Sequence, residues 1–421
     1  MSELLKRLRR STLSGDLTVL YGAQVAGLIV PIVTIPYLAR VLRPEGFGLL
    51  VFAQSFAAWL SLVLEYGFDL SATRAVARVR GDRVALTDVV TGVQGAKIVL
   101  TAGITVAAAI AYPLVPFFRG HGVLLFWAWA FAVLKGLSPF WFFLGTQRMR
   151  FPATLDAGSR VIAALGVFVW VRAPDDGWRV IALQTVASGA SLAMMTGWLY
   201  QQVPVRSPTR FLTKKTFRES AAIFVFRASS GIYIQANAFI LGLMTMPQVV
   251  AYFGGAEKIV RAAINLLNPI SQALFPRLSH LVIADPIGAK RLFRYTLLGM
   301  LGLGLSMGLV AFFGAVQLVR ILLGPGYEAA VPVLKILAIL PVLVALGGAL
   351  GLHWALPLGH DKAFYRLVLA GGGLNLALAL ILAPRSGAVG MAIAVISAEL
   401  LVSSGLLILF RLHRFSKITK S

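Results

Sequence analysis

Five polar residues recur at steps of three or four within an otherwise apolar stretch, residues 248–275. They are Lys258, Arg261, Asn265, Asn268 and Gln272, a spacing that places them along one face of a helix. Glu257 stands four residues before Arg261, so a local ion pair accounts for those two charges. In a bilayer such a stripe faces either an aqueous cavity or a partner helix. A cavity lining and a purely structural pairing therefore both remain open.

Five more cations lie inside apolar stretches. Arg160 has Asp156 four residues before it, which favours a structural pair, and Lys335 is shallow enough to snorkel outward. The depth of the other three makes them candidates for binding an anion. Arg227 lies about seven residues, or roughly 10 Å, into residues 220–243, where an uncompensated charge costs on the order of 3 kcal/mol. That stretch offers it no acid at helical spacing, so its partner comes from another helix or a ligand. Because Lys and Arg in a low-dielectric cavity suit a phosphate group, we expect one substrate cavity. The residues expected there are Arg227, Lys258, Arg261, Asn265, Asn268, Lys97 and Lys135.

Four acids are candidates for coupling transport to an ion. Glu399 and Glu257 each lie within an apolar stretch, where a carboxyl group can exchange a proton. Glu65 and Asp69 stand four residues apart, a like-charge spacing that requires a basic neighbour or a proton, and Arg74 is the expected neighbour. For Glu399, a structural partner such as Lys135 is an equally good interpretation.

The composition places these residues in a membrane. The chain has 421 residues, of which 58% are hydrophobic and 13% charged, and its mean hydropathy is +0.83. Apolar spans long enough to cross a bilayer recur from end to end. We expect twelve: 17–38, 47–68, 88–112, 123–144, 153–172, 179–200, 220–243, 248–275, 295–322, 330–356, 363–383 and 387–410.

The charges between these spans indicate their orientation. With charges at the ends of the spans counted in the adjoining gaps, the termini and the gaps on one side of the membrane hold 25 of the 39 Lys and Arg residues, the opposite gaps hold 7, and 7 lie well within spans. Basic loops stay on the cytoplasmic side, so both termini are expected there. Because most of the basic residues lie in the gaps between spans, the net charge of +23 does not indicate a nucleic-acid partner.

These observations predict an all-α integral membrane protein. We expect twelve transmembrane helices in two pseudo-symmetric six-helix bundles around a central cavity. The domains would be residues 1–200, a basic cytoplasmic linker at 201–219, and residues 220–421. A weak internal repeat supports two halves, because the PEGFGLLVFAQ segment at 44–54 matches PQVVAYFGGAE at 247–257 in spacing.

Enzymatic chemistry has little support in the sequence. There is no cysteine, no G-x-x-x-x-G-K-[ST] loop for ATP, and the five histidines show no metal-ligand spacing. We therefore expect no cofactor, no metal and no catalytic residues.

The segment IVTIPYLARVLRPEGFGLLVFAQS, followed by LEYGFDLSATRAVARVRGD, closely resembles the polysaccharide-export branch of the superfamily that also contains multidrug and toxin extruders. Well-known members are O-antigen flippases. The resemblance implies a secondary transporter in the bacterial inner membrane that flips undecaprenyl-pyrophosphate-linked oligosaccharides by alternating access. Its implied partners are the lipid-linked oligosaccharide, membrane lipid, and the polysaccharide polymerase and chain-length machinery. The alternatives are an organic-cation exporter of the same superfamily and a non-transporting scaffold of a glycan-assembly complex.

The predicted topology has a direct test. Reporter fusions at Thr209, in the basic linker, and at Asp176, in an outer gap, should report opposite sides of the membrane. A fusion pair that reports the same side would contradict the twelve-span arrangement.

Overall fold

The computed structural model describes residues 12–115, 118 and 120–413, and every regular element in those ranges is a helix. Within these described ranges, eight segments are long and apolar enough to cross a membrane, and the chain is a multi-pass membrane protein. These segments are Ile29–Arg78, Arg83–Leu114, Gly122–Gly145, Arg150–Trp170, Pro174–Gln202, Pro286–Phe313, Ala330–Ala355 and Asp361–His413. The all-helical membrane class is thus confirmed, while the number twelve stays a prediction.

Two of the helices are each a pair joined at a kink. In α2 (Thr12–Glu65) the joining residue is Arg43, with φ 56° and ψ 175°. In α18 (Asp361–His413) it is Gly387, with φ 53° and ψ −128°. Backbone angles of this kind interrupt the helical hydrogen-bond ladder, so the chain can change direction at both residues.

The helices form two compact units, which we describe separately. The first contains the chain up to Leu42 together with Ala53–Ala228, and the second contains Arg43–Phe52 together with Ser229–Ser421. The short segment Arg43–Phe52 therefore packs in the second unit although its neighbours on both sides belong to the first. The interval 201–219, expected as a linker, is helical from Arg210 onward, where α10 (Arg210–Gln235) begins.

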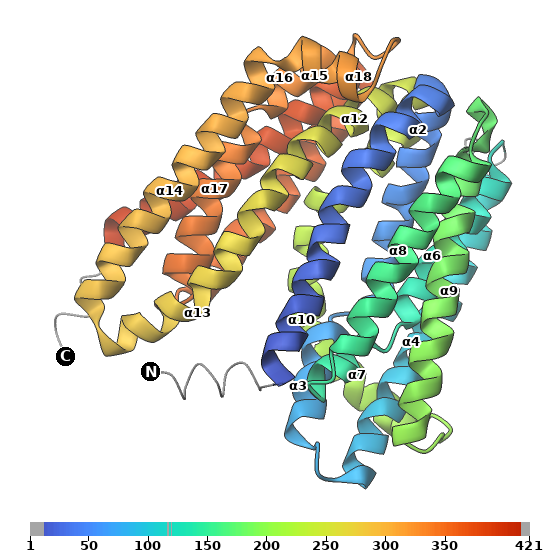
Figure 1. The fold of residues 1–421 in the computed structure, drawn as a ribbon, viewed down its shortest axis with the longest axis vertical. Coiled ribbons are helices and arrows are strands. Elements are labelled where there is room, and N and C mark those ends of the chain that lie inside the picture. Colours follow the sequence, from blue (N-terminus) through green and yellow to red (C-terminus); the bar gives the residue numbers. More distant parts are fainter. Residues whose placement is uncertain (1–11, 116–117, 119, 414–421) are drawn as a thin grey trace. The chain divides into compact units, whose positions relative to one another are not determined.

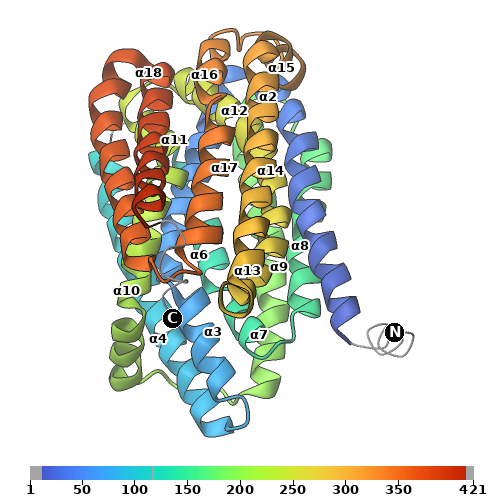
Figure 2. The same cartoon turned by 90° about the vertical axis from the view of Figure 1, so that its left-hand side faces the viewer.

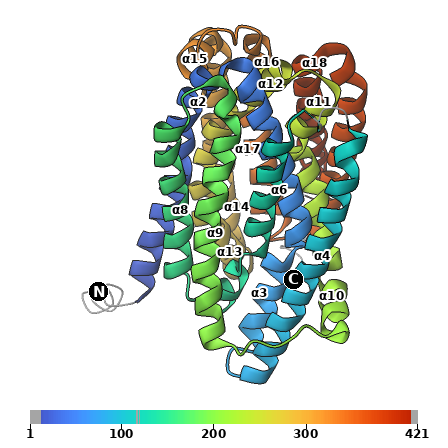
Figure 3. The ribbon, with the colours of Figure 1, turned by 90° about the vertical axis from the view of Figure 1, so that its right-hand side faces the viewer.

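The first unit is a bundle of long helices with two short ones at one end (Figures 1 and 3). Helix α9 packs against both α6 and α8, while the short helices α3 and α7 pack against each other. Their bounds are α3 (Phe68–Arg78), α4 (Arg83–Leu114), α6 (Gly122–Leu137), α7 (Phe140–Gly145), α8 (Arg150–Trp170), a 3₁₀ turn (Pro174–Asp176) and α9 (Gly177–Gln202).

Helix α10 packs in this unit against a sharp break in the chain between α2 and α3. Tyr66 (φ 43°) and Gly67 (φ 75°) both have left-handed backbone angles. The Tyr66 ring stacks on Phe224 of α10 with centroids 4.3 Å apart, and a side chain at position 67 would meet Ile223 of α10 at 2.7 Å. The break therefore brings the start of α3 against the helix that carries Arg227.

In the second unit, α14, α17 and α18 run alongside one another (Figure 2). Helix α12 packs against α16 and α18 and continues through a 3₁₀ turn (Asn265–Leu267) into α13. Near its end α17 widens into a π-helical turn, Gly351–Ala355. The bounds are α11 (Asn237–Met244), α12 (Pro247–Ile264), α13 (Asn268–Ala284), α14 (Pro286–Phe313), α15 (Ala315–Leu322), α16 (Ala330–Leu337) and α17 (Leu340–Leu350).

The two copies of the internal repeat pack directly on each other in the second unit. A Cβ at Gly48 would collide with the backbone of Pro247 and Ala251, and a Cβ at Gly254 would collide with the Val51 side chain. In the repeat alignment Gly48 corresponds to Ala251 and Val51 to Gly254, so equivalent residues meet, as they do across an approximate twofold axis. The two glycines permit this close helix contact.

Candidate functional site

A cavity of about 440 Å³ lies within the first unit and gathers charged side chains from six helices. The cations lining it come from α4, α6, α8 and α10, and the acids from α2, α3 and α8. Serine hydroxyls and three aromatic rings complete the wall. The charged lining residues are Glu65, Asp69, Lys97, Lys135, Asp156, Arg160 and Arg227.

The ion pair between Asp69 and Arg227 connects α3 to α10 at this cavity. Asp69 lies in the first turn of α3, where the partial positive charge of the helix N-terminus favours a carboxylate. Its Oδ2 accepts from Arg227 Nη2, while its buried Oδ1 has no hydrogen-bond partner. The side chains of Arg227 and Asp69 are 37% and 34% exposed, so neither is sealed from a ligand.

Lys97 is far more enclosed, with only 3% of its surface exposed. Its Nζ donates to the carbonyl oxygen of Ser138 at 2.9 Å, and Glu65 and Asp69 are the acids whose charge acts on it. Ser138 follows the last residue of α6, where Pro139 starts the turn into α7 and leaves carbonyls without helical partners. Lys97 therefore stabilises the α6–α7 break, and two ammonium hydrogens remain for other acceptors.

The remaining polar lining is of two kinds. Arg160 and Asp156 of α8 form an ion pair of 2.8 Å, as their spacing of four residues predicts. Lys135 of α6 stands 6.0 Å from the centroid of the Phe131 ring. On α9, Ser188 and Ser191 face the same cavity, and the buried Oγ of Ser191 has no hydrogen-bond partner. These groups add hydroxyl donors beside the cations.

The second unit holds the other predicted residues. Arg261 donates to Glu257 at 2.8 Å and to the carbonyl of Ile234 at 3.1 Å, which confirms the ion pair expected from spacing. Glu257 also acts electrostatically on Lys258, and Arg261 on Glu399. Asn268 and Asn265 contact each other at 3.4 Å across the 3₁₀ turn. The polar stripe therefore follows α12 into α13 with an interruption, because the helix is broken at residues 265–267.

The expected basic neighbour of the acids was wrong. Glu65 and Asp69 lie on two different helices, because α2 ends at Glu65 and α3 begins at Phe68. The basic partner of Asp69 is Arg227 rather than Arg74, since Arg74 lies further along α3 and lines a different pocket. Helical spacing alone does not predict that two consecutive residues, such as Tyr66 and Gly67, adopt left-handed backbone angles and end a helix.

Sequence reasoning also missed residues that line the cavity. Ser188 and Ser191 were not considered, although two serines three residues apart in an apolar helix mark one polar face. Asp156 and Arg160 were expected as a structural pair only, yet they also face the cavity.

Comparison with solved structures defines the class of protein. The fold is similar to the lipid II flippase MurJ in its inward closed conformation, with a TM-score of 0.70, 12% identity, and coverage of 97% of this chain and 90% of that one. It is also similar to a multidrug resistance MATE family transporter of the MOP superfamily in its inward-facing conformation, with a TM-score of 0.64, 14% identity, and coverage of 94% and 99%. The chain therefore shares the fold of these two solved structures.

Sequence comparison then gives the family. The family model described as polysaccharide biosynthesis protein matches residues 15–282. A protein of Escherichia coli (strain K12) named as an O-antigen transporter is 30% identical over 402 residues, covering 93% of this chain and 96% of that protein. A protein of Shigella dysenteriae with the same name is 26% identical over 394 residues, covering 92% and 97%. The chain belongs to the polysaccharide biosynthesis protein family, and it is a transporter rather than an enzyme.

Lys97 offers a test of how the cavity is held together. Lys97→Met removes the only cation donating to Ser138 in the described ranges and leaves Glu65 without its charge, so folding should weaken by about 3–5 kcal/mol. The measurement is the thermal unfolding midpoint of purified protein. Lys97→Met combined with Glu65→Gln should recover part of the loss, whereas Lys135→Met should have a much smaller effect. Equal midpoints for Lys97→Met and Lys135→Met would contradict this role.

Proposed function

We propose that this protein is a flippase that moves undecaprenyl-pyrophosphate-linked oligosaccharide units across the inner membrane by alternating access, for surface polysaccharide assembly. The observation that carries the proposal is the cavity of the first unit, in which Lys97, Lys135 and Arg227 approach one space from three helices. Diphosphate oxygens are acceptors for these donors, and an arginine can bind two of them at once. The names of the relatives, O-antigen transporters, agree with such a cargo.

The predicted residues of the two units have different proposed roles. Arg227, Lys97 and Lys135 hold the diphosphate, while Lys258, Arg261, Asn265 and Asn268 form the polar contribution of the second unit. Because Arg227 is paired with Asp69, the diphosphate must displace that carboxylate to bind. Serine hydroxyls such as Ser188 and Ser191 suit sugar hydroxyls, and the isoprenoid chain stays in lipid.

The proposed topology has twelve membrane crossings in two six-helix bundles, with both termini in the cytoplasm. The kinks at Arg43 and Gly387 support it, since each divides a helix of more than 50 residues into two lengths suited to a bilayer of roughly 30 Å. The domains remain proposed as 1–200, 201–219 and 220–421. A polysaccharide polymerase and chain-length machinery are the proposed protein partners.

One observation favours a second candidate function. The Arg227–Asp69 pair and the Arg160–Asp156 pair neutralise charges within the cavity, which a non-transporting scaffold would also require. An organic-cation exporter is less well supported, because the cavity lining carries four cations against three acids and so has a net positive charge. Export measurements on Arg227 variants separate the flippase from the scaffold.

Arg227→Ala should abolish polysaccharide export in a deletion strain, and Arg227→Lys should restore it only partly, because lysine lacks the two-pronged donor geometry. The readouts are surface polysaccharide and the amount of folded protein in the membrane. Arg210→Ala is the matched control, since Arg210 is an exposed residue of the same helix outside the cavity. Normal export by well-expressed Arg227→Ala would overturn the flippase proposal for this site.

Four acids are proposed for ion coupling: Glu399, Glu257, Glu65 and Asp69. Replacing the coupling acid by glutamine or asparagine removes its exchangeable proton, so transport should lose its dependence on a pH gradient in a variant whose amount of folded protein in the membrane matches wild type. The measurement is export with and without an uncoupler for each variant. If all four variants stay gradient-driven, the coupling group is not among them.

A further inference from the structure

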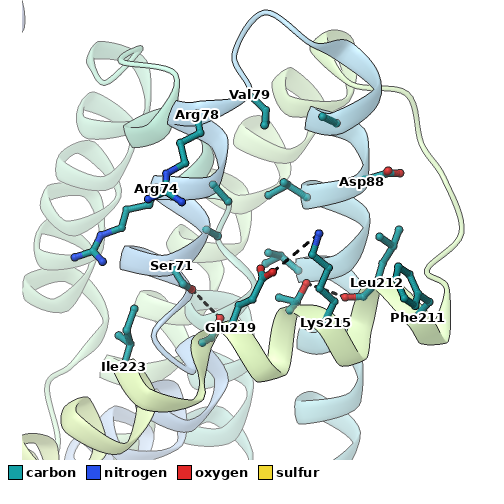
Figure 4. Close-up of a pocket in the computed structure, with 17 residues that line it drawn as sticks. Ser71, Arg74, Arg78, Val79, Asp88, Phe211, Leu212, Lys215, Glu219 and Ile223 are labelled. Atoms are coloured by element: carbon teal, nitrogen blue, oxygen red, sulfur yellow. Dashed lines mark hydrogen bonds and ion pairs between the residues drawn. The ribbon is translucent and has the colours of Figure 1, made fainter.

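A second cavity in the first unit lies apart from the substrate site. It has a volume of about 640 Å³ and is bounded by α3, the first turns of α4 and the first half of α10 (Figure 4). Its deepest polar contact is the hydrogen bond of 2.7 Å between the Ser71 and Ser220 hydroxyls. Thr216 donates to the carbonyl of Leu212, so the hydroxyls of α10 in the wall already have partners. The groups left to bind a ligand are therefore the charged ones.

The charges of this cavity do not cancel. Asp88 is held by Arg206 at 2.9 Å, and Lys215 faces Glu219 at 4.0 Å, the long limit of an ion pair. Arg74 and Arg78 also line the cavity, and within the described ranges neither has an acid within ion-pair distance. Figure 4 shows both arginines leaving the same side of α3, one turn apart. Two neighbouring guanidinium groups form a binding edge for phosphate oxygens.

The surroundings of the cavity match the surface of a membrane. Phe211, which lines it, is 76% exposed. The first half of α10 also carries Arg210, Lys214 and Arg218, so this large apolar side chain stands among cations. That combination is typical of a helix at the boundary between headgroups and acyl chains. Basic pockets at this depth on the cytoplasmic side bind anionic headgroups.

We propose that this cavity binds the phosphate of an anionic membrane lipid, with Arg74 and Arg78 as its ligands. The lipid is a resident of the bilayer and not the transported cargo, because the site is separate from the cavity of Lys97 and Arg227. The proposal rests on the proposed orientation, which places the α3–α4 turn on the cytoplasmic side.

Such a lipid is positioned to influence transport through α10. This helix carries Glu219 and Ser220 in the wall of the lipid cavity and Arg227 in the substrate cavity, about 12 Å further along. It also packs tightly on α4, where side chains at Gly92 and Gly95 would collide with Thr216 and Thr213. A headgroup bound between α3 and α10 therefore stabilises the helix that presents Arg227.

The test measures binding of phosphatidylglycerol to the purified full-length protein by native mass spectrometry, with phosphatidylcholine as the neutral lipid and inorganic phosphate as the soluble competitor. Wild type should prefer phosphatidylglycerol, and Arg74→Ala/Arg78→Ala should weaken that binding by about tenfold or more. The matched control is Arg210→Ala/Arg218→Ala, which removes the same charge from exposed positions outside the cavity and should change binding by less than about twofold.

Three outcomes would overturn the proposal. Equal losses in both double variants would mean that surface charge alone attracts the lipid. Unchanged binding in Arg74→Ala/Arg78→Ala would exclude the two arginines. Displacement of phosphatidylglycerol by millimolar inorganic phosphate would assign the site to a soluble anion. Because this assay measures no export, its failure is distinguishable from failure of the flippase proposal, which Arg227→Ala tests.

Discussion

Arg227 brings a fixed positive charge into a chain that is 58% hydrophobic, and much of the first unit serves to keep that charge in polar contact. The Tyr66–Gly67 break ends α2 and starts α3 with Asp69 in its first turn, directly against α10. The stacking of Tyr66 on Phe224 holds the two helices at this point. Because an isolated charge is costly in a low-dielectric environment, this docking is a condition for placing Arg227 in the membrane at all.

The cavity that results is close to electrically balanced and only partly satisfied. Asp69 keeps one buried oxygen without a partner, and Lys97 uses one of its three hydrogens on Ser138. Groups in this condition hold a folded bundle together and can still exchange partners with an anion. The same interactions can thus serve stability without cargo and recognition with it. Under the proposed function, the protein would therefore retain these cations in the membrane while no diphosphate is bound.

Helix breaks distribute the polar groups in both units. At Ser138–Pro139 the end of α6 frees a carbonyl oxygen that accepts a hydrogen bond from Lys97, and at residues 265–267 a 3₁₀ turn divides the polar stripe of α12 and α13. Broken helices are tolerated in membranes where side chains satisfy the freed backbone groups. The repeat segments 44–54 and 247–257 illustrate the opposite case, since Gly48 and Gly254 allow unbroken helices to touch along their backbones.

Local chemistry was readable from the sequence, whereas long-range pairing was not. The apolar spans, the Arg261–Glu257 and Arg160–Asp156 pairs and the position of Arg227 inside an apolar span follow from hydropathy and from helical spacing, both of which depend on residues a few positions apart. Asp69, the partner of Arg227, lies 158 positions away in the sequence. Asp69 pairs with Arg227 and not with Arg74 because of two left-handed residues between α2 and α3, which no periodicity encodes. Likewise, three separate helices carry Lys97, Lys135 and Arg227, and only the packing of those helices brings the three cations to one cavity. Packing also places Lys258 and Arg261 in the other unit. Side-chain type and spacing thus determined which charges enter the membrane. Tertiary packing decided which of these charges pair, because any helix that brings an opposite charge close enough can stabilise a buried one.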